Sequence, residues 1–154
     1  MFLPRLVLYA FESEADRDYS EWVSLRVLWT VIDINVRWLL EHPGTTSLYA
    51  SRLRYNGQAY QLGQEDWMDL PSAYRTCKEP DKCGVGTDCK VLVAIRVAEL
   101  RAHGENARPY LVRQRQFIKA DGSPSWGYHV IVQRGDGSFE DPSTILGMPS
   151  KTTF

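Results

Sequence analysis

One apolar segment, running from Cys89 to about His103, constrains the fold of this chain more than any other. Its apolar residues recur with helical spacing, Asp88 before it is a favoured N-cap residue, and Gly104 after it is a typical helix stop. The pattern predicts a helix whose first residue is a cysteine. Because a helix N-terminus offers unpaired N–H groups and the positive end of a dipole, it favours the thiolate form of that cysteine.

The stretch that follows this helix has the composition of strands and turns. Residues 109–118 and 128–134 are typical strand segments, rich in aromatic and β-branched side chains. Gly135-Asp136-Gly137 separates the second segment from residues 138–141 and has the composition of a hairpin turn. We therefore predict a strand followed by a β-hairpin.

Three residues in this half of the chain are the parts of a thiol nucleophile with its base and orienting acid. Cys89 opens the predicted helix, His129 lies on a strand, and Asp141 lies on the next strand. Acyl-transfer enzymes of the papain and transglutaminase type use Cys, His and Asp in this chain order. The sequence therefore predicts a catalytic triad of Cys89, His129 and Asp141.

The choice of the acidic residue depends on the length of the hairpin loop. If the loop is the three residues 135–137, the register places Asp141 opposite Ile131, on the same sheet face as His129. Glu140 then points to the opposite face. A two-residue loop would turn Asp141 away from the histidine. We predict the three-residue loop and assign the acid to Asp141.

The first half of the chain carries fewer functional signals. Residues 20–41 have apolar side chains on more than one helical face and predict a long scaffold helix, stopped by the Pro-Gly pair that follows. Residues 43–88 have no sustained period, and we expect loops and short helices there, including one over 65–70 that ends at Pro71. Trp67 is either a wall of the cleft beside the thiol or a core residue, and core packing is favoured.

Length and composition set the broad class. The chain has 154 residues, enough for one domain with a proper core. With 24% charged residues and a net charge of -1, it has no basic excess that would indicate nucleic-acid binding. No apolar run reaches the roughly 18 residues of a membrane-spanning helix. Residues 6–11 resemble a strand or packing arm more than a signal peptide.

The three cysteines also allow interpretations other than catalysis. Cys77, Cys83 and Cys89 are spaced as C-x5-C-x5-C, wider than the usual pairs of a structural zinc site, for which His103 would be the fourth ligand. Cys77 and Cys83 either form a disulfide in an oxidising setting or remain free loop thiols. Without a secretion signal a reducing compartment is expected, so free thiols are favoured.

A larger set of short motifs points to a particular family. They are His42-Pro43, Ser47-Leu48-Tyr49, Arg54-Tyr55, residues 65–71, Asp88-Cys89, residues 96–101, Tyr128-His129-Val130 and residues 137–143. On these motifs the chain resembles a family of small transglutaminase-like, papain-superfamily cysteine proteins encoded by tailed bacteriophages and prophages. The resemblance spans most of the chain.

The resemblance implies an α+β, papain/transglutaminase-like fold in which the nucleophile helix packs on a small antiparallel sheet. It implies a single transglutaminase-like cysteine peptidase domain over residues 1–154, with the nucleophile, base and acid at Cys89, His129 and Asp141 and with no cofactor or metal. The sequence departs from the family at two positions: Thr87 separates Gly86 from the Asp-Cys pair, and Lys90 stands where an acidic residue is common. A lysine beside the thiol would support a thiolate.

These observations predict a thiol acyl-transfer enzyme that acts on protein or peptide amides. The acyl group passes either to water, as in a peptidase or amidase, or to an amine, as in a transglutaminase, and we favour water. The expected partner is a phage or host protein, not nucleic acid or a membrane. The expected location is the bacterial host cytoplasm or the virion, without a secretion signal. The alternative is a non-catalytic phage structural or assembly protein that retains the fold.

Overall fold

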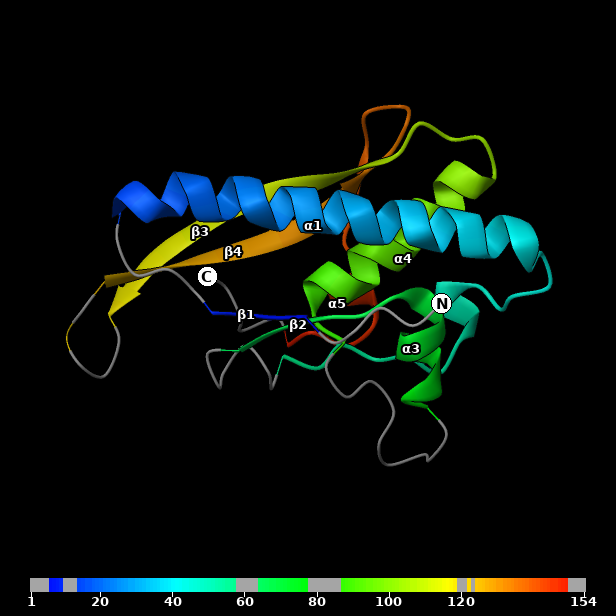
Figure 1. Cartoon of the computed structure of the whole chain (residues 1–154), viewed down its shortest axis with the longest axis horizontal. Coiled ribbons are helices and arrows are strands. Elements are labelled where there is room, and N and C mark those ends of the chain that lie inside the picture. The colour runs from blue at the N-terminus through cyan, green and yellow to red at the C-terminus, as the bar shows by residue number, and fades with distance from the viewer. Residues whose placement is uncertain are drawn as a thin grey trace.

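The computed structural model describes residues 6–9, 14–57, 64–77, 87–118, 122 and 124–149, and within them the fold is mixed α+β (Figure 1). The helices are α1 (Glu14–Glu41), α3 (Leu70–Arg75), α4 (Cys89–Ala102) and α5 (Pro142–Ile145), with a short 3-10 helix η1 (Leu48–Ala50). Strands β1 (Leu6–Tyr9) and β2 (Gln64–Trp67) form one antiparallel pair. Strands β3 (Arg108–Ile118), β4 (Pro124–Gln133) and β5 (Phe139–Glu140) form an antiparallel sheet in that order. The coarse expectation of an α+β fold with a small antiparallel sheet is confirmed.

Helix α4 begins and ends as its sequence predicts. The Asp88 side chain caps it, with Oδ1 accepting the N–H groups of Lys90 at 3.0 Å and Val91 at 3.4 Å. At the other end, His103 is the C-cap and Gly104 has a φ of 87°, the left-handed conformation that glycine adopts without strain. Local signals therefore fix the cysteine as the first residue of the helix.

Two apolar clusters enclose α4 on opposite sides. The first joins α4 to α1 and the sheet, and its buried members are Leu28, Val31, Ile32, Trp67, Val93, Ala94, Val97, Leu100, Ala107, Val130 and Val132. The second joins α4 to η1, α3 and α5, and its buried members are Leu48, Leu53, Leu70, Ala73, Val91, Leu92, Ile95 and Leu146. Figure 1 shows α4 crossing α1 near the middle of the molecule, with α3 below this crossing. This burial fixes the position of the cysteine-bearing end of α4.

The hairpin that joins β4 to β5 has the predicted three-residue loop. The N–H of Arg134 donates to the carbonyl of Ser138 at 2.8 Å, and Gly137 has a φ of 87°. The β4–β5 pairing then sets Val132 opposite Glu140. The register on which the choice of Asp141 depends is thus the one that the turn sequence indicates.

One predicted element is wrong. Residues 65–70 do not form a helix that ends at Pro71, because residues up to Trp67 belong to β2 and pair with β1. The helix in this region, α3, instead contains Pro71 in its first turn, where a missing N–H costs nothing. Asp69 caps it by accepting the N–H of Ser72 at 2.9 Å. The Asp-x-Pro pattern marks a helix start here.

The two N-terminal elements agree with the sequence in kind. Helix α1 ends at Glu41 as predicted, but begins at Glu14 and not at residue 20. After its last residue, His42 stacks on Trp38 with ring centroids 3.8 Å apart. Strand β1 confirms the strand expected within residues 6–11. Among the described residues, no helix has the length and apolar character needed to span a membrane.

The burial of α4 leads to a stability prediction. Leu92→Ala removes a fully buried side chain at the centre of the second cluster, and we expect it to lower the free energy of unfolding by about 2–5 kcal/mol. Leu40→Ala is the control, because Leu40 is 64% exposed on α1 and should change stability little. Urea unfolding followed by circular dichroism measures both. Equal effects of the two substitutions would contradict the central role of α4 in the core.

Candidate active site

Cys89 is the first residue of α4, and its side chain is half-buried against the first apolar cluster. It is the free cysteine of the described part of the chain. The Cys89 side chain is also close enough to His129 to help raise the pKa of the imidazole. The structure therefore brings together the predicted nucleophile and base, which are far apart in the sequence.

His129 lies on β4 and connects the thiol to the predicted acid. Its Nε2 donates to Oδ2 of Asp141 at 2.9 Å. The His129 side chain is only 9% exposed, whereas the Asp141 side chain is 28% exposed. The three predicted site residues thus interact through the imidazole, which is hydrogen-bonded to the carboxylate and lies near enough to the thiol for the two to affect each other's charge.

Asp141 has a second role that the sequence interpretation missed. It follows β5 directly and is the N-cap of α5, so that Oδ1 accepts the N–H groups of Ser143 at 3.0 Å and Thr144 at 3.4 Å. Its Oδ2 accepts the Thr144 hydroxyl at 2.8 Å besides the imidazole. The signal for this cap was present, since Asp141 is followed by Pro142 at the first helical position. The cap holds the carboxylate in the orientation in which it meets His129.

Electrostatics favour the charged forms of the histidine and the acid. Burial opposes ionisation of the ring, but the hydrogen bonds to Asp141 and Cys89 outweigh it and raise the pKa of His129 from 6.5 to about 9. Burial also acts to raise the pKa of Asp141, yet the hydrogen bonds from His129 and Thr144 hold it below its ordinary value. An imidazolium beside the thiol is the arrangement that stabilises a thiolate.

The charges of Asp88 and Lys90 largely offset each other beside the thiol. The Lys90 ammonium contacts Oδ2 of Asp88 and lies 5.6 Å from the ring centroid of Trp67. The positive charge of Lys90 therefore offsets the negative charge of Asp88, which would otherwise oppose a thiolate. Trp67 itself is 4% exposed and belongs to the first apolar cluster, which agrees with the favoured interpretation of a core residue.

The residues before the thiol shape the start of α4. Thr87 is fully buried, and its hydroxyl donates to the carbonyl of Arg54 at 2.6 Å. Its carbonyl accepts the N–H of Asn56 at 3.0 Å. Cys89 is the first residue of α4, so its N–H has no carbonyl within the helix to which it could donate. An N–H at this position is the kind of donor that an oxyanion can use.

The other cysteine interpretations change in the structure. Cys77 is in a disulfide bond, so the expectation of free loop thiols is wrong for this residue, while Cys83 lies outside the described residues. Cys89 and His103 stand at opposite ends of α4, about 20 Å apart by helix geometry, and cannot share one zinc ion. His103 Nδ1 is hydrogen-bonded to the carbonyl of Glu99 at 2.7 Å. No group of three or more potential metal-ligating side chains occurs among the described residues.

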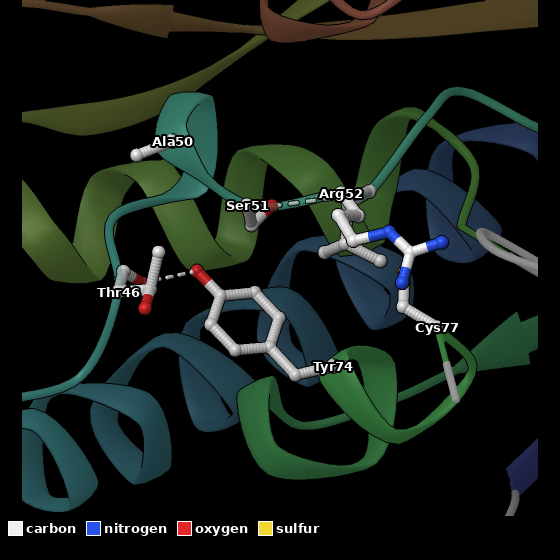
Figure 2. Close-up of a pocket in the computed structure, with 7 residues that line it drawn as sticks. Thr46, Ala50, Ser51, Arg52, Tyr74 and Cys77 are labelled. Atoms are coloured by element: carbon white, nitrogen blue, oxygen red, sulfur yellow. Dashed lines mark hydrogen bonds between the residues drawn. The ribbon is translucent and has the colours of Figure 1, made fainter. Parts of the chain in front are cut away.

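A cavity of about 290 Å³ lies away from the three site residues. Its lining residues are Thr46, Ala50, Ser51, Arg52, Leu53, Tyr74 and Cys77. Figure 2 shows Tyr74 pointing across the cavity toward Thr46, whose carbonyl accepts the Tyr74 hydroxyl at 2.7 Å. Neither the thiol nor its partners line this cavity, so it is separate from the candidate active site.

Comparisons with protein-family models, with curated proteins and with solved structures found no match for this chain. The functional interpretation therefore depends on the geometry and chemistry of the residues themselves. That geometry is specific, because three residues chosen from the sequence come from α4, β4 and the start of α5 and meet at one place.

The raised pKa of His129 predicts a pH dependence of stability. The pKa of His129 is 6.5 in the unfolded chain and about 9 in the folded protein, so its protonation stabilises the folded state. This stabilisation is fully present below pH 6.5 and disappears as the pH rises through 9. We expect the free energy of unfolding to fall by up to roughly 3 kcal/mol over this window. NMR titration of the imidazole and urea unfolding at several pH values measure both effects.

Asp141→Asn is the matched variant for this titration. Asparagine caps a helix as well as aspartate but carries no charge, so we expect the His129 midpoint to fall while α5 remains folded. Asp141→Ala removes both the cap and the charge and should cost a further ~1 kcal/mol. A wild-type midpoint at or below the ordinary value of 6.5 would contradict the interaction described here.

Proposed function

We propose that this protein is a thiol acyl-transfer enzyme of the Cys-His-Asp type that acts on protein or peptide amides. The observation that supports this most directly is the series of contacts from Asp141 Oδ2 to His129 Nε2, at 2.9 Å, and from the imidazole to the thiol of Cys89. The thiol stands at a helix N-terminus, where an anion is stabilised. Each group thus has the neighbour that its role requires.

The chemical steps follow from these positions. The Cys89 thiolate attacks the carbonyl carbon of the amide, and the backbone N–H of Cys89 donates to the oxyanion that forms. The His129 imidazolium gives its proton to the leaving nitrogen, the C–N bond breaks, and a thioester remains. Neutral His129 then takes a proton from water, the resulting hydroxide attacks the thioester, and the acid product leaves as the thiolate re-forms. Asp141 keeps the ring in one orientation throughout.

This chemistry belongs to the family that the chain resembles, the transglutaminase-like, papain-superfamily cysteine proteins of tailed phages and prophages. In such a protein the fold is the papain/transglutaminase-like version of α+β, and all 154 residues form a single cysteine peptidase domain. The substrate is then a phage or host protein, met in the host cytoplasm or in the virion. The proposed reaction requires neither a cofactor nor a metal ion.

Water is the acyl acceptor that we favour. Transfer to an amine needs a second binding site and an environment from which water is excluded. Trp67, the aromatic residue that the sequence offered as a cleft wall, is buried in the core, and its ring lies under the Lys90 ammonium. Trp67 is therefore a core residue and does not form the exposed wall of a cleft from which water would be excluded.

Alkylation of Cys89 tests the proposal without a known substrate. We expect iodoacetamide to modify Cys89 of the folded protein rapidly at about pH 6, where an ordinary thiol is almost entirely protonated. His129→Ala should slow the modification at this pH by about tenfold to a hundredfold, because the imidazolium that supports the thiolate is lost. Peptide mass spectrometry of the Cys89 peptide, without reductant, gives the rate at each pH.

The control variant is His103→Ala, at the opposite end of the same helix, and it should leave the rate unchanged. The second control is the Cys89 peptide in denatured protein, which reports an ordinary thiol. If folded and denatured Cys89 show the same pH profile, the enzymatic proposal is wrong. The protein would then be the alternative, a non-catalytic phage structural or assembly protein that retains the fold.

An activated ester distinguishes the two acyl acceptors. We expect p-nitrophenyl acetate to acylate Cys89 and release nitrophenolate in a burst that matches the amount of protein, with Cys89→Ser showing no burst. Adding a primary amine should leave acetate as the product if water is the acceptor. Formation of the acetylated amine, measured by mass spectrometry, would show amine transfer and overturn the preference for hydrolysis.

A further inference from the structure

Glu140, the residue before Asp141, is held by side chains from three other parts of the fold. Its carboxylate accepts Nε of Arg96 at 2.6 Å and Nη2 of the same residue at 3.4 Å. It also accepts Nη1 of Arg134 at 3.0 Å and the hydroxyl of Tyr49. The Glu140 side chain is 13% exposed. These hydrogen bonds outweigh its burial and keep the pKa of Glu140 below its ordinary value.

Arg96 is the centre of this group and lies on α4. Its Nη1 donates to Oε2 of Glu99 at 3.1 Å, and its guanidinium lies 4.9 Å from the ring centroid of Tyr49. Glu99 is 5% exposed, and its Oε1 accepts the N–H of Leu48 at 2.5 Å. Two carboxylates and an aromatic face therefore hold the guanidinium in one position, as its planar fork allows.

The backbone pairing that holds this part of the chain is short. Strand β5 has two residues, and its pairing with β4 ends at Glu140, one residue before the acid of the site. The guanidinium of Arg96 binds the side chain of Glu140, that last paired residue. Cys89 and Arg96 belong to the same helix and lie about 10 Å apart along its axis, so the helix keeps the separation of these two residues constant.

We propose that Arg96, acting through Glu140, is a positioning residue that sets Asp141 and therefore His129 at the correct distance from Cys89. Helix α4 thus determines two things at once: it presents the thiol at its N-terminus and, two turns further on, anchors the strand that leads to the acid. The inference depends on the proposed function, because positioning matters only if the three residues react together.

The test compares Arg96→Met and Glu140→Gln with the matched variant Arg101→Met. Arg101 lies on the same helix, donates to the carbonyl of Ala107 at 3.0 Å and covers the ring of Trp29, but makes no contact with Glu140. We measure the pH profile of Cys89 alkylation and the NMR midpoint of His129, at temperatures where circular dichroism shows each variant folded.

We expect Arg96→Met and Glu140→Gln each to slow alkylation at about pH 6 by roughly tenfold and to lower the His129 midpoint toward that of Asp141→Asn. The double variant should slow alkylation less than the product of the two single effects, because both substitutions remove the same Arg96–Glu140 contact. Arg96→Lys should restore part of the rate, since lysine keeps the charge but not the fork. Arg101→Met should match the wild type.

Two results would overturn the inference in distinguishable ways. If the wild type shows a low-pH reactive thiol and both network variants keep that profile while melting at lower temperature, the network is only structural. If the wild type itself shows an ordinary thiol, the proposed function fails first. Glu140→Gln preserves the shape of the side chain, so it remains informative if Arg96→Met does not fold.

Discussion

Helix α4 packs against α1 and the sheet on one side and against η1, α3 and α5 on the other, and the candidate site depends on this burial. Side chains in a close-packed interior leave little freedom for the helix to shift or rotate. The Asp88 cap then determines the exact residue at which the helix starts. A thiol on its first residue is therefore held in a fixed position without being deeply buried itself.

The acid of the site is held by independent contacts that all involve charged or polar groups. Asp141 is at once the cap of α5 and the partner of His129: Oδ1 accepts backbone N–H groups of α5, and Oδ2 accepts the imidazole and the Thr144 hydroxyl. The preceding residue, Glu140, joins the guanidinium groups of Arg96 and Arg134. Half-buried carboxylates are costly unless they are paired, and here each has hydrogen-bond donors from several elements. The result is a rigid acid at the end of a very short strand.

Much of the site could be predicted because its signals are local. The start of α4 follows from Asp88, and the register of the hairpin follows from a loop that ends in Gly137. Because side chains alternate along strands, this register alone separates Asp141 from Glu140. The helix predicted over residues 65–70 was wrong, because pairing with β1, a contact remote in sequence, outweighs a weak local preference.

The sequence by itself determined which residues could be nucleophile, base and acid, and that the first two stand on a helix start and a strand, whereas Asp141 caps a helix and does not lie on the strand that was predicted for it. Caps, turns and strand alternation involve neighbours only a few residues apart, so their patterns are visible in the chain. Only the tertiary structure decided that Cys89 meets His129 and that Arg96 meets Glu140, 44 residues further on. Such contacts arise when apolar clusters bring whole elements together, and no local pattern specifies which polar side chains then face each other.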